Sequence, residues 1–141
     1  MMFLYKVFTN TVMALLYCFM AQAIYNFHRD KAVYFRFVTC TAVGINLIYF
    51  LDRYILMSFK ALFITLFLAI TAQLVMRLKT MQAIVSAAIF IISLAVGDIS
   101  AVLLLIKVYG YQGEVIRNNL FLSITADVVV YGIVIIIIFL I

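Results

Sequence analysis

The chain has 141 residues, of which 70% are hydrophobic and 11% are charged, and its formal net charge is +5. Soluble domains are closer to half apolar and a quarter charged, so this composition indicates an all-α, polytopic membrane protein. No polar stretch approaches the roughly 50 residues of a small soluble domain, which excludes an enzyme built on such a domain within this sequence. The modest positive charge fits basic loops against anionic headgroups and not nucleic-acid binding.

Apolar runs divide the chain into about five predicted transmembrane helices, arranged as an antiparallel bundle that forms one domain, residues 1–141. A helix needs about 20 mostly apolar residues to cross a bilayer. The predicted helices cover about 4–25, 35–54, 58–76, 81–108 and 116–141. The localisation that follows is the cell membrane, with several passes.

The first apolar run has two interpretations. Lys6, an apolar stretch and then Ala21-Gln22-Ala23 loosely resemble a signal peptide with a small-x-small cleavage site. An uncleaved helix is preferred, because the run is long for a signal core. In addition, the charged cluster NFHRDKAVYFR at 26–36 follows it, where a mature domain would otherwise begin.

Basic residues gather in two loops, which the positive-inside rule places in the cytoplasm. The N-terminus and the turns near Met57 and Gln112 are then outside, and the C-terminal end is inside. Each side carries five basic residues, so this orientation is a hypothesis that rests on the dense first loop. The inside set is Arg29, Lys31, Arg36, Arg77 and Lys79.

Two acids in the middle of apolar runs are the main functional signal. Asp98 lies 14 residues before Gln112, the centre of a polar turn, and Asp127 lies 15 residues after it. At about 1.5 Å per residue, both carboxyl groups are roughly 21 Å below the turn, so antiparallel helices would bring them level. Intramembrane acids usually face the protein interior and find a partner. A purely structural role, in which each acid is protonated or bonded to a neighbouring Ser, Thr or Asn, stays open.

Further polar residues complete the candidate binding set. Asn46 and Gln73 lie in apolar runs, where we expect hydrogen bonds to other helices. The turn YGYQGEVIRNN at 109–119 adds three candidates that are either ligand contacts or solvated helix ends. The full set is Asp98, Asp127, Asn46, Gln73, Asn119, Glu114 and Arg117.

Small residues recur at every fourth position beside Asp98. Ser93, Gly97 and Ala101 form a small-xxx-small-xxx-small face, which lets a neighbouring backbone approach closely. Packing within the chain is preferred to a dimerisation surface as the interpretation.

Motifs for catalysis and metal binding are missing from the sequence. There is no HExxH, GxSxG, Walker loop or CxxC, and the one histidine, His28, falls in a loop. Cys18 and Cys40 are interpreted as small buried hydrophobes. The acids lack the Gly-x-Gly-Asp pattern of intramembrane aspartyl proteases, since Asp98 follows Ala95-Val96-Gly97. We therefore predict no catalytic residue, no metal site and no cofactor.

The order of features resembles the N-terminal membrane sensor region of accessory-gene-regulator-type bacterial sensor histidine kinases, which have a GHKL-class kinase domain. The matching features are HRDKAVYFR, the helix KTMQAIVSAAIFIISLAVGDI with its mid-span acid, the turn YGYQGEVIRNN and a final aliphatic helix. The resemblance covers most of the chain and implies detection of a ligand, often a small peptide, ahead of a dimeric helix and a cytoplasmic kinase domain.

The expected function is therefore a non-catalytic, ligand-sensing transmembrane module. The sequence contains no kinase motif, and its last run stops at Ile141 without a basic flank, as expected of a piece of a longer protein or of an orphan relative. The expected partners are the lipid bilayer, a second copy or a larger membrane assembly, and an extracellular small ligand. The alternatives are a small oligomeric transporter or channel subunit that uses the two acids, and a structural membrane subunit.

Overall fold

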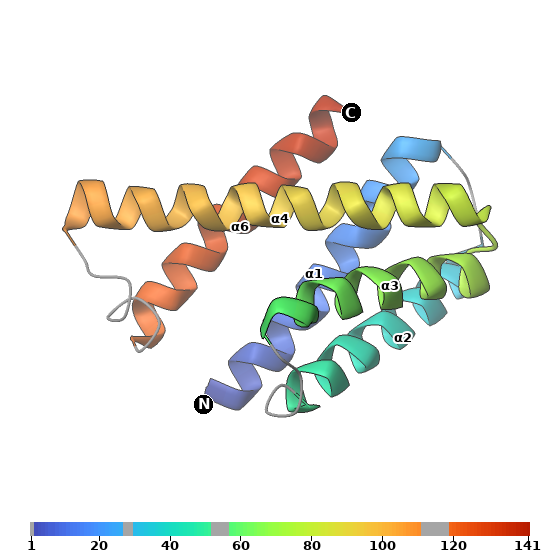
Figure 1. The fold of residues 1–141 in the computed structure, drawn as a ribbon, viewed down its shortest axis with the longest axis horizontal. Coiled ribbons are helices and arrows are strands. Elements are labelled where there is room, and N and C mark those ends of the chain that lie inside the picture. Colours follow the sequence, from blue (N-terminus) through green and yellow to red (C-terminus); the bar gives the residue numbers. More distant parts are fainter. Residues whose placement is uncertain (1, 27–29, 52–56, 111–118) are drawn as a thin grey trace. The chain divides into compact units, whose positions relative to one another are not determined.

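A computed structural model describes residues 2–26, 30–51, 57–110 and 119–141, and helices account for nearly all of them (Figure 1). The described residues contain no strand, so the predicted all-α class is confirmed. The helices are α1 (Met2–Tyr25), α2 (Lys31–Phe50), α3 (Met57–Val75), α4 (Thr80–Tyr109) and α6 (Leu120–Leu140).

Four of these helices, α1, α2, α4 and α6, are long and apolar enough to cross a bilayer. Helix α3 has 19 residues, which at about 1.5 Å per residue extend roughly 28 Å, close to the roughly 30 Å of a hydrocarbon core. The helices thus agree with a multi-pass membrane protein.

Helix ends follow local backbone chemistry more than hydrophobicity. Helix α2 starts at Lys31, although the prediction placed its start near residue 35. Sequence reasoning assigned the intervening residues to a loop because of their charge, but lysine and arginine are good helix formers. Asn26 and Gly110, after α1 and α4, have φ angles of 45° and 70°. Left-handed residues of this kind end helices by turning the chain away from the helix axis.

The chain divides into two compact units, an N-terminal unit (Phe3–Ile91) and a C-terminal unit (Ile92–Ile141). In the N-terminal unit, α1 and α2 run antiparallel. Near the start of α1 the ring of Phe3 lies 5.4 Å from that of Phe50, and further along Asn10 bonds to Asn46. Helix α3 packs on α2 in turn (Figure 1).

Glycine sets the contact between α2 and α3. A β-carbon built on Gly44 would overlap the ring of Phe67. The Phe67 ring therefore occupies the place where any other residue would put its side chain. This ring-on-backbone contact holds the two helices close together.

Tyr17 lies at the centre of the N-terminal unit and is fully buried. Its hydroxyl donates to the carbonyl oxygen of Leu68 on α3 at 3.4 Å and lies 3.2 Å from the Oγ atom of Ser86 on α4. Its ring packs 5.5 Å from that of Phe37 on α2 and 5.2 Å from that of Phe90 on α4. A buried tyrosine needs a partner for its hydroxyl, and here one side chain contacts every other helix of the unit.

The C-terminal unit consists of the remainder of α4 packed against α6. A β-carbon on Gly97 would lie 3.0 Å from Cγ1 and 3.2 Å from Cα of Val130, so the two helices meet almost backbone to backbone. Further along, buried Leu105 and Leu122 pack together with Ala126. The small-residue face thus packs within the chain at Gly97, as the preferred interpretation predicted.

Candidate functional site

The two intramembrane acids lie beside the close approach of α4 and α6. Asp98 directly follows Gly97, and Asp127 precedes Val130 by three residues, about one helical turn. Their carboxyl groups are close enough to interact electrostatically. Asp98 is 11 residues from the end of α4 at Tyr109, about 16 Å along the helix. That distance is about half the thickness of a hydrocarbon core.

The acids differ in their surroundings. The side chain of Asp98 is exposed on the surface of the chain, where the sequence predicted a position inside the protein, and that of Asp127 is half-buried. The difference arises because Gly97, and not Asp98, is directed at α6. Two carboxyl groups near one another within apolar spans are typical of sites on ion or proton pathways.

Asn46 and Gln73 belong to the N-terminal unit and serve helix packing. Asn10 donates from Nδ2 to Oδ1 of Asn46 at 2.9 Å, and Asn46 donates to the carbonyl oxygen of Ala42 at 2.9 Å. Gln73 donates to Oγ1 of Thr80, the first residue of α4, at 3.1 Å. Both side chains thus make the hydrogen bonds to other helices that the sequence predicted.

The predicted outer turn contributes one described residue. Asn119 caps α6, because its side-chain oxygen accepts a hydrogen bond from the backbone N–H of Phe121 at 3.0 Å. This is the ordinary role of an N-cap asparagine. Glu114 and Arg117 lie outside the described residues, so their proposed contact with a ligand stays a prediction.

A cationic cluster around Tyr49 was missed at the level of sequence. Lys6 donates a hydrogen bond to the Tyr49 hydroxyl, and its Nζ atom lies 4.5 Å from the centre of the ring. The Nζ atom of Lys60 lies 5.5 Å from the same ring. Such cation–π contacts stabilise ammonium groups away from bulk water. The cluster could have been found from the sequence only by first pairing Asn10 with Asn46, because that pair fixes the register of α1 against α2.

Metal binding finds no support among the residues that the structure describes, since none of their His, Cys, Asp and Glu side chains form a group of three or more. The two cysteines are both free thiols. Cys18 is buried, as predicted, whereas Cys40 is exposed. Cys40 therefore differs from the predicted buried hydrophobe, because the face of α2 that carries it borders an open pocket.

Comparisons of the chain with protein-family models, with curated proteins and with solved structures found no match. The resemblance to a histidine-kinase sensor region therefore stays a prediction. The geometry of the acid pair and the course of α4 are the features on which a function can be argued.

Proposed function

We propose that this chain is the ligand-sensing transmembrane module of a bacterial sensor histidine kinase of the accessory-gene-regulator type, or of an orphan relative of that family. The order of basic loop, acid-bearing helix, polar turn and aliphatic helix supports this proposal at the level of sequence. The ligand is a small extracellular molecule such as a peptide, and signalling involves a second copy or a larger assembly.

The course of α4 is the observation that carries the proposal. This helix runs without a break for 30 residues, Thr80–Tyr109, and contributes to both compact units. Its first part packs on Tyr17 through Ser86 and Phe90, and its second part packs on α6 at Gly97. We propose that ligand binding shifts α4, since small helix shifts are a common route of signalling. Asp98 and Asp127 act in this proposal as a polar hinge.

A kinase fusion tests the proposal. The chain is joined at Ile141 to a cytoplasmic histidine-kinase domain, and autophosphorylation is measured with and without the small-peptide fraction of spent culture medium from the source cells. We expect the fraction to change autophosphorylation. Unchanged phosphorylation in this and every other fraction of the medium would contradict a sensing role.

A matched pair of variants tests transmission through α4. Ile91→Gly together with Ile92→Gly weakens the helix between the units, since glycine costs about 1 kcal/mol relative to alanine at each position. We expect this variant to lose the response, while Ile91→Ala together with Ile92→Ala keeps it. Equal responses from the two variants would show that α4 does not carry the signal.

The proximity of the two carboxyl groups favours one alternative, a small oligomeric channel or transporter subunit. Acids at this depth are typical of ion and proton pathways. Proton and cation flux into liposomes distinguishes the two functions. Flux that is present in the wild type and lost in both Asp98→Asn and Asp127→Asn would support transport. Equal flux in all three proteins would exclude these carboxyl groups as the path.

A further inference from the structure

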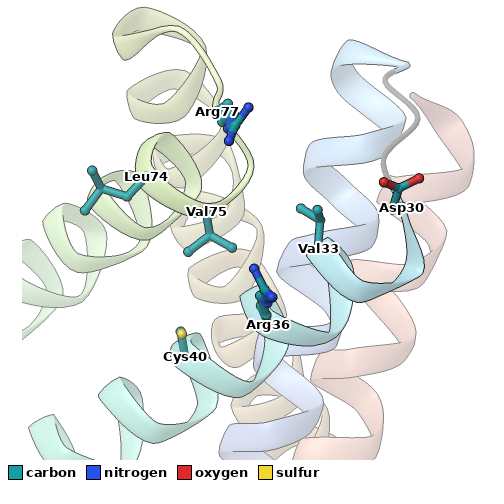
Figure 2. A pocket seen from close by; sticks show the side chains of 7 residues that line it. All are labelled: Asp30, Val33, Arg36, Cys40, Leu74, Val75 and Arg77. Atoms are coloured by element: carbon teal, nitrogen blue, oxygen red, sulfur yellow. The ribbon is translucent and has the colours of Figure 1, made fainter.

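A pocket of about 900 Å³ opens between the N-terminal part of α2 and the chain that follows α3 (Figure 2). Two arginines from these separate segments border it. Figure 2 shows Arg36 pointing up from α2 and Arg77 above it on the segment that follows α3, while Asp30 lies at the start of α2, away from α3. The lining residues are Asp30, Val33, Arg36, Cys40, Leu74, Val75 and Arg77.

The lining is charged at one end and apolar at the other. Two arginines and one aspartate leave a formal charge of +1 on it. Lys31 and Lys79 are exposed at the ends of the neighbouring segments, and neither lines the pocket. Guanidinium groups bind phosphate oxygens through paired, charge-assisted hydrogen bonds. The charged end is therefore suited to a phosphate group.

An apolar groove of about 490 Å³ continues from this pocket and shares Cys40, Leu74 and Val75 with it. It follows the surface between α2 and α3 and reaches Leu47 and Phe67. Its lining on α2 includes Cys40, Gly44 and Leu47, which are spaced to lie on one helical face. A ligand that fills both spaces has a charged head and an apolar tail.

The length of this combined surface matches one leaflet of a bilayer. Arg36 and Leu47 are 11 residues apart on α2, which corresponds to about 16 Å. A hydrocarbon core is about 30 Å thick, so one leaflet is about half of that. A lipid whose headgroup lies at Arg36 would extend its acyl chain along the groove to about the middle of the membrane.

We propose that this surface binds an anionic phospholipid, with the phosphate between Arg36 and Arg77 and one acyl chain in the groove between α2 and α3. The predicted orientation places the arginines at the cytoplasmic leaflet, where anionic lipids attract basic segments. The site lies wholly within the N-terminal unit. It depends neither on the sensor role nor on the acid pair.

Native mass spectrometry tests the preference for anionic lipid. The protein is purified with equal parts of phosphatidylglycerol and phosphatidylcholine, and the lipid retained on each molecule is identified. We expect at least about a tenfold preference for phosphatidylglycerol, equivalent to about 1.4 kcal/mol. Arg36→Gln and Arg77→Asn should each reduce this preference severalfold. Lys79→Gln, which removes a charge on the same side but outside the pocket lining, should preserve it.

The groove is tested separately from the arginines. Val43→Trp fills the groove and leaves the charged end intact, so we expect it to reduce lipid retention. Leu62→Trp, at an equally exposed position on α3 that does not line the groove, is the matched control and should retain lipid. Circular dichroism confirms that the variants keep their helical content.

Three results would overturn the proposal. Equal retention of the two lipids would indicate ordinary surface lipid. Displacement of the lipid by inorganic phosphate at an equal concentration would indicate a site for free anions. Full retention in Val43→Trp would show that no acyl chain occupies the groove.

Cys40 gives an independent readout of position, because it is the exposed one of the two thiols and lies where pocket and groove join. In phosphatidylglycerol vesicles, a membrane-permeant maleimide should modify Cys40 at least about threefold more slowly in the wild type than in Arg36→Gln, as expected of a mostly occupied site. Lys79→Gln should react like the wild type. Equal rates in the wild type and Arg36→Gln would place the lipid elsewhere and contradict the proposal.

Discussion

The two units of this chain are held together in different ways. In the N-terminal unit, directional contacts converge on Tyr17, which bonds to α3 and α4 and stacks with rings from α2 and α4. In the C-terminal unit, α4 and α6 meet across Gly97 with aliphatic side chains around it, and the two acids lie beside that contact. The comparison teaches that helices of one membrane chain can be held by directional polar and aromatic contacts in one unit and by close backbone approach in another.

The largest expected effect comes from removing the centre of the N-terminal unit. Tyr17→Ala should lower the free energy of unfolding by about 3–5 kcal/mol, the usual cost of truncating a buried aromatic residue to alanine. Unfolding in detergent, followed by circular dichroism, measures the change. Phe19→Ala is the control, because Phe19 is on the same helix and is 56% exposed. Similar losses in the two variants would contradict the central role of Tyr17.

The C-terminal unit should be most sensitive at Gly97. Gly97→Val should cost about 1–3 kcal/mol, because the new side chain would press on the backbone of Val130. Gly132→Val on α6 is a matched control, since nothing lies within 4 Å of a β-carbon at Gly132. The same unfolding measurement compares them. Equal stability of the two variants would mean that α4 and α6 do not pack at Gly97.

The acid pair should show a smaller and asymmetric effect. Asp127→Leu should cost about 1 kcal/mol, because a half-buried polar side chain on a membrane helix usually contributes a hydrogen bond to a neighbouring helix. Ile136→Leu, at an exposed position on the same helix, should be neutral. Expression level and unfolding in detergent measure both. Equal expression and stability of the two variants would show that Asp127 contributes nothing to folding. Any role of the acids would then be in function.

The smallest expected effect concerns the Asn10–Asn46 hydrogen bond. A double-mutant cycle with Asn10→Ala and Asn46→Ala should give a coupling energy of about 0.6 kcal/mol, the average for hydrogen bonds between membrane helices. A coupling near zero would show that aromatic contacts, and not this bond, set the register of α1 on α2. The cycle therefore sharpens the view that directional contacts order the N-terminal unit.

Features that depend on position along one or two helices were predictable from sequence. The similar spacings of Asp98 and Asp127 from Gln112, 14 and 15 residues, indicated an antiparallel pair, and the spacing of Gly97 and its neighbours indicated close packing. Both follow from the rise of a helix per residue and need no information about a third element.

Features that join several helices were not predictable in the same way. Tyr17 contacts three other helices, so its role requires their registers to be known together. Arg36 and Arg77 were interpreted as loop charges that set topology, and their shared pocket depends on how α2 and α3 pack. The exposure of Asp98 likewise follows from Gly97 taking the contact with α6. The sequence alone does not show which of these two neighbouring residues faces α6.

The contact between Gly44 and Phe67 affects the width of the groove between α2 and α3. The aromatic ring rests where a β-carbon would otherwise stand, so the ring can lie against the backbone of α2 only because residue 44 is glycine. A methyl group at this position would displace the ring outward and narrow the groove that Phe67 and Gly44 line together. The width of the groove is thus set by one residue that has no side chain.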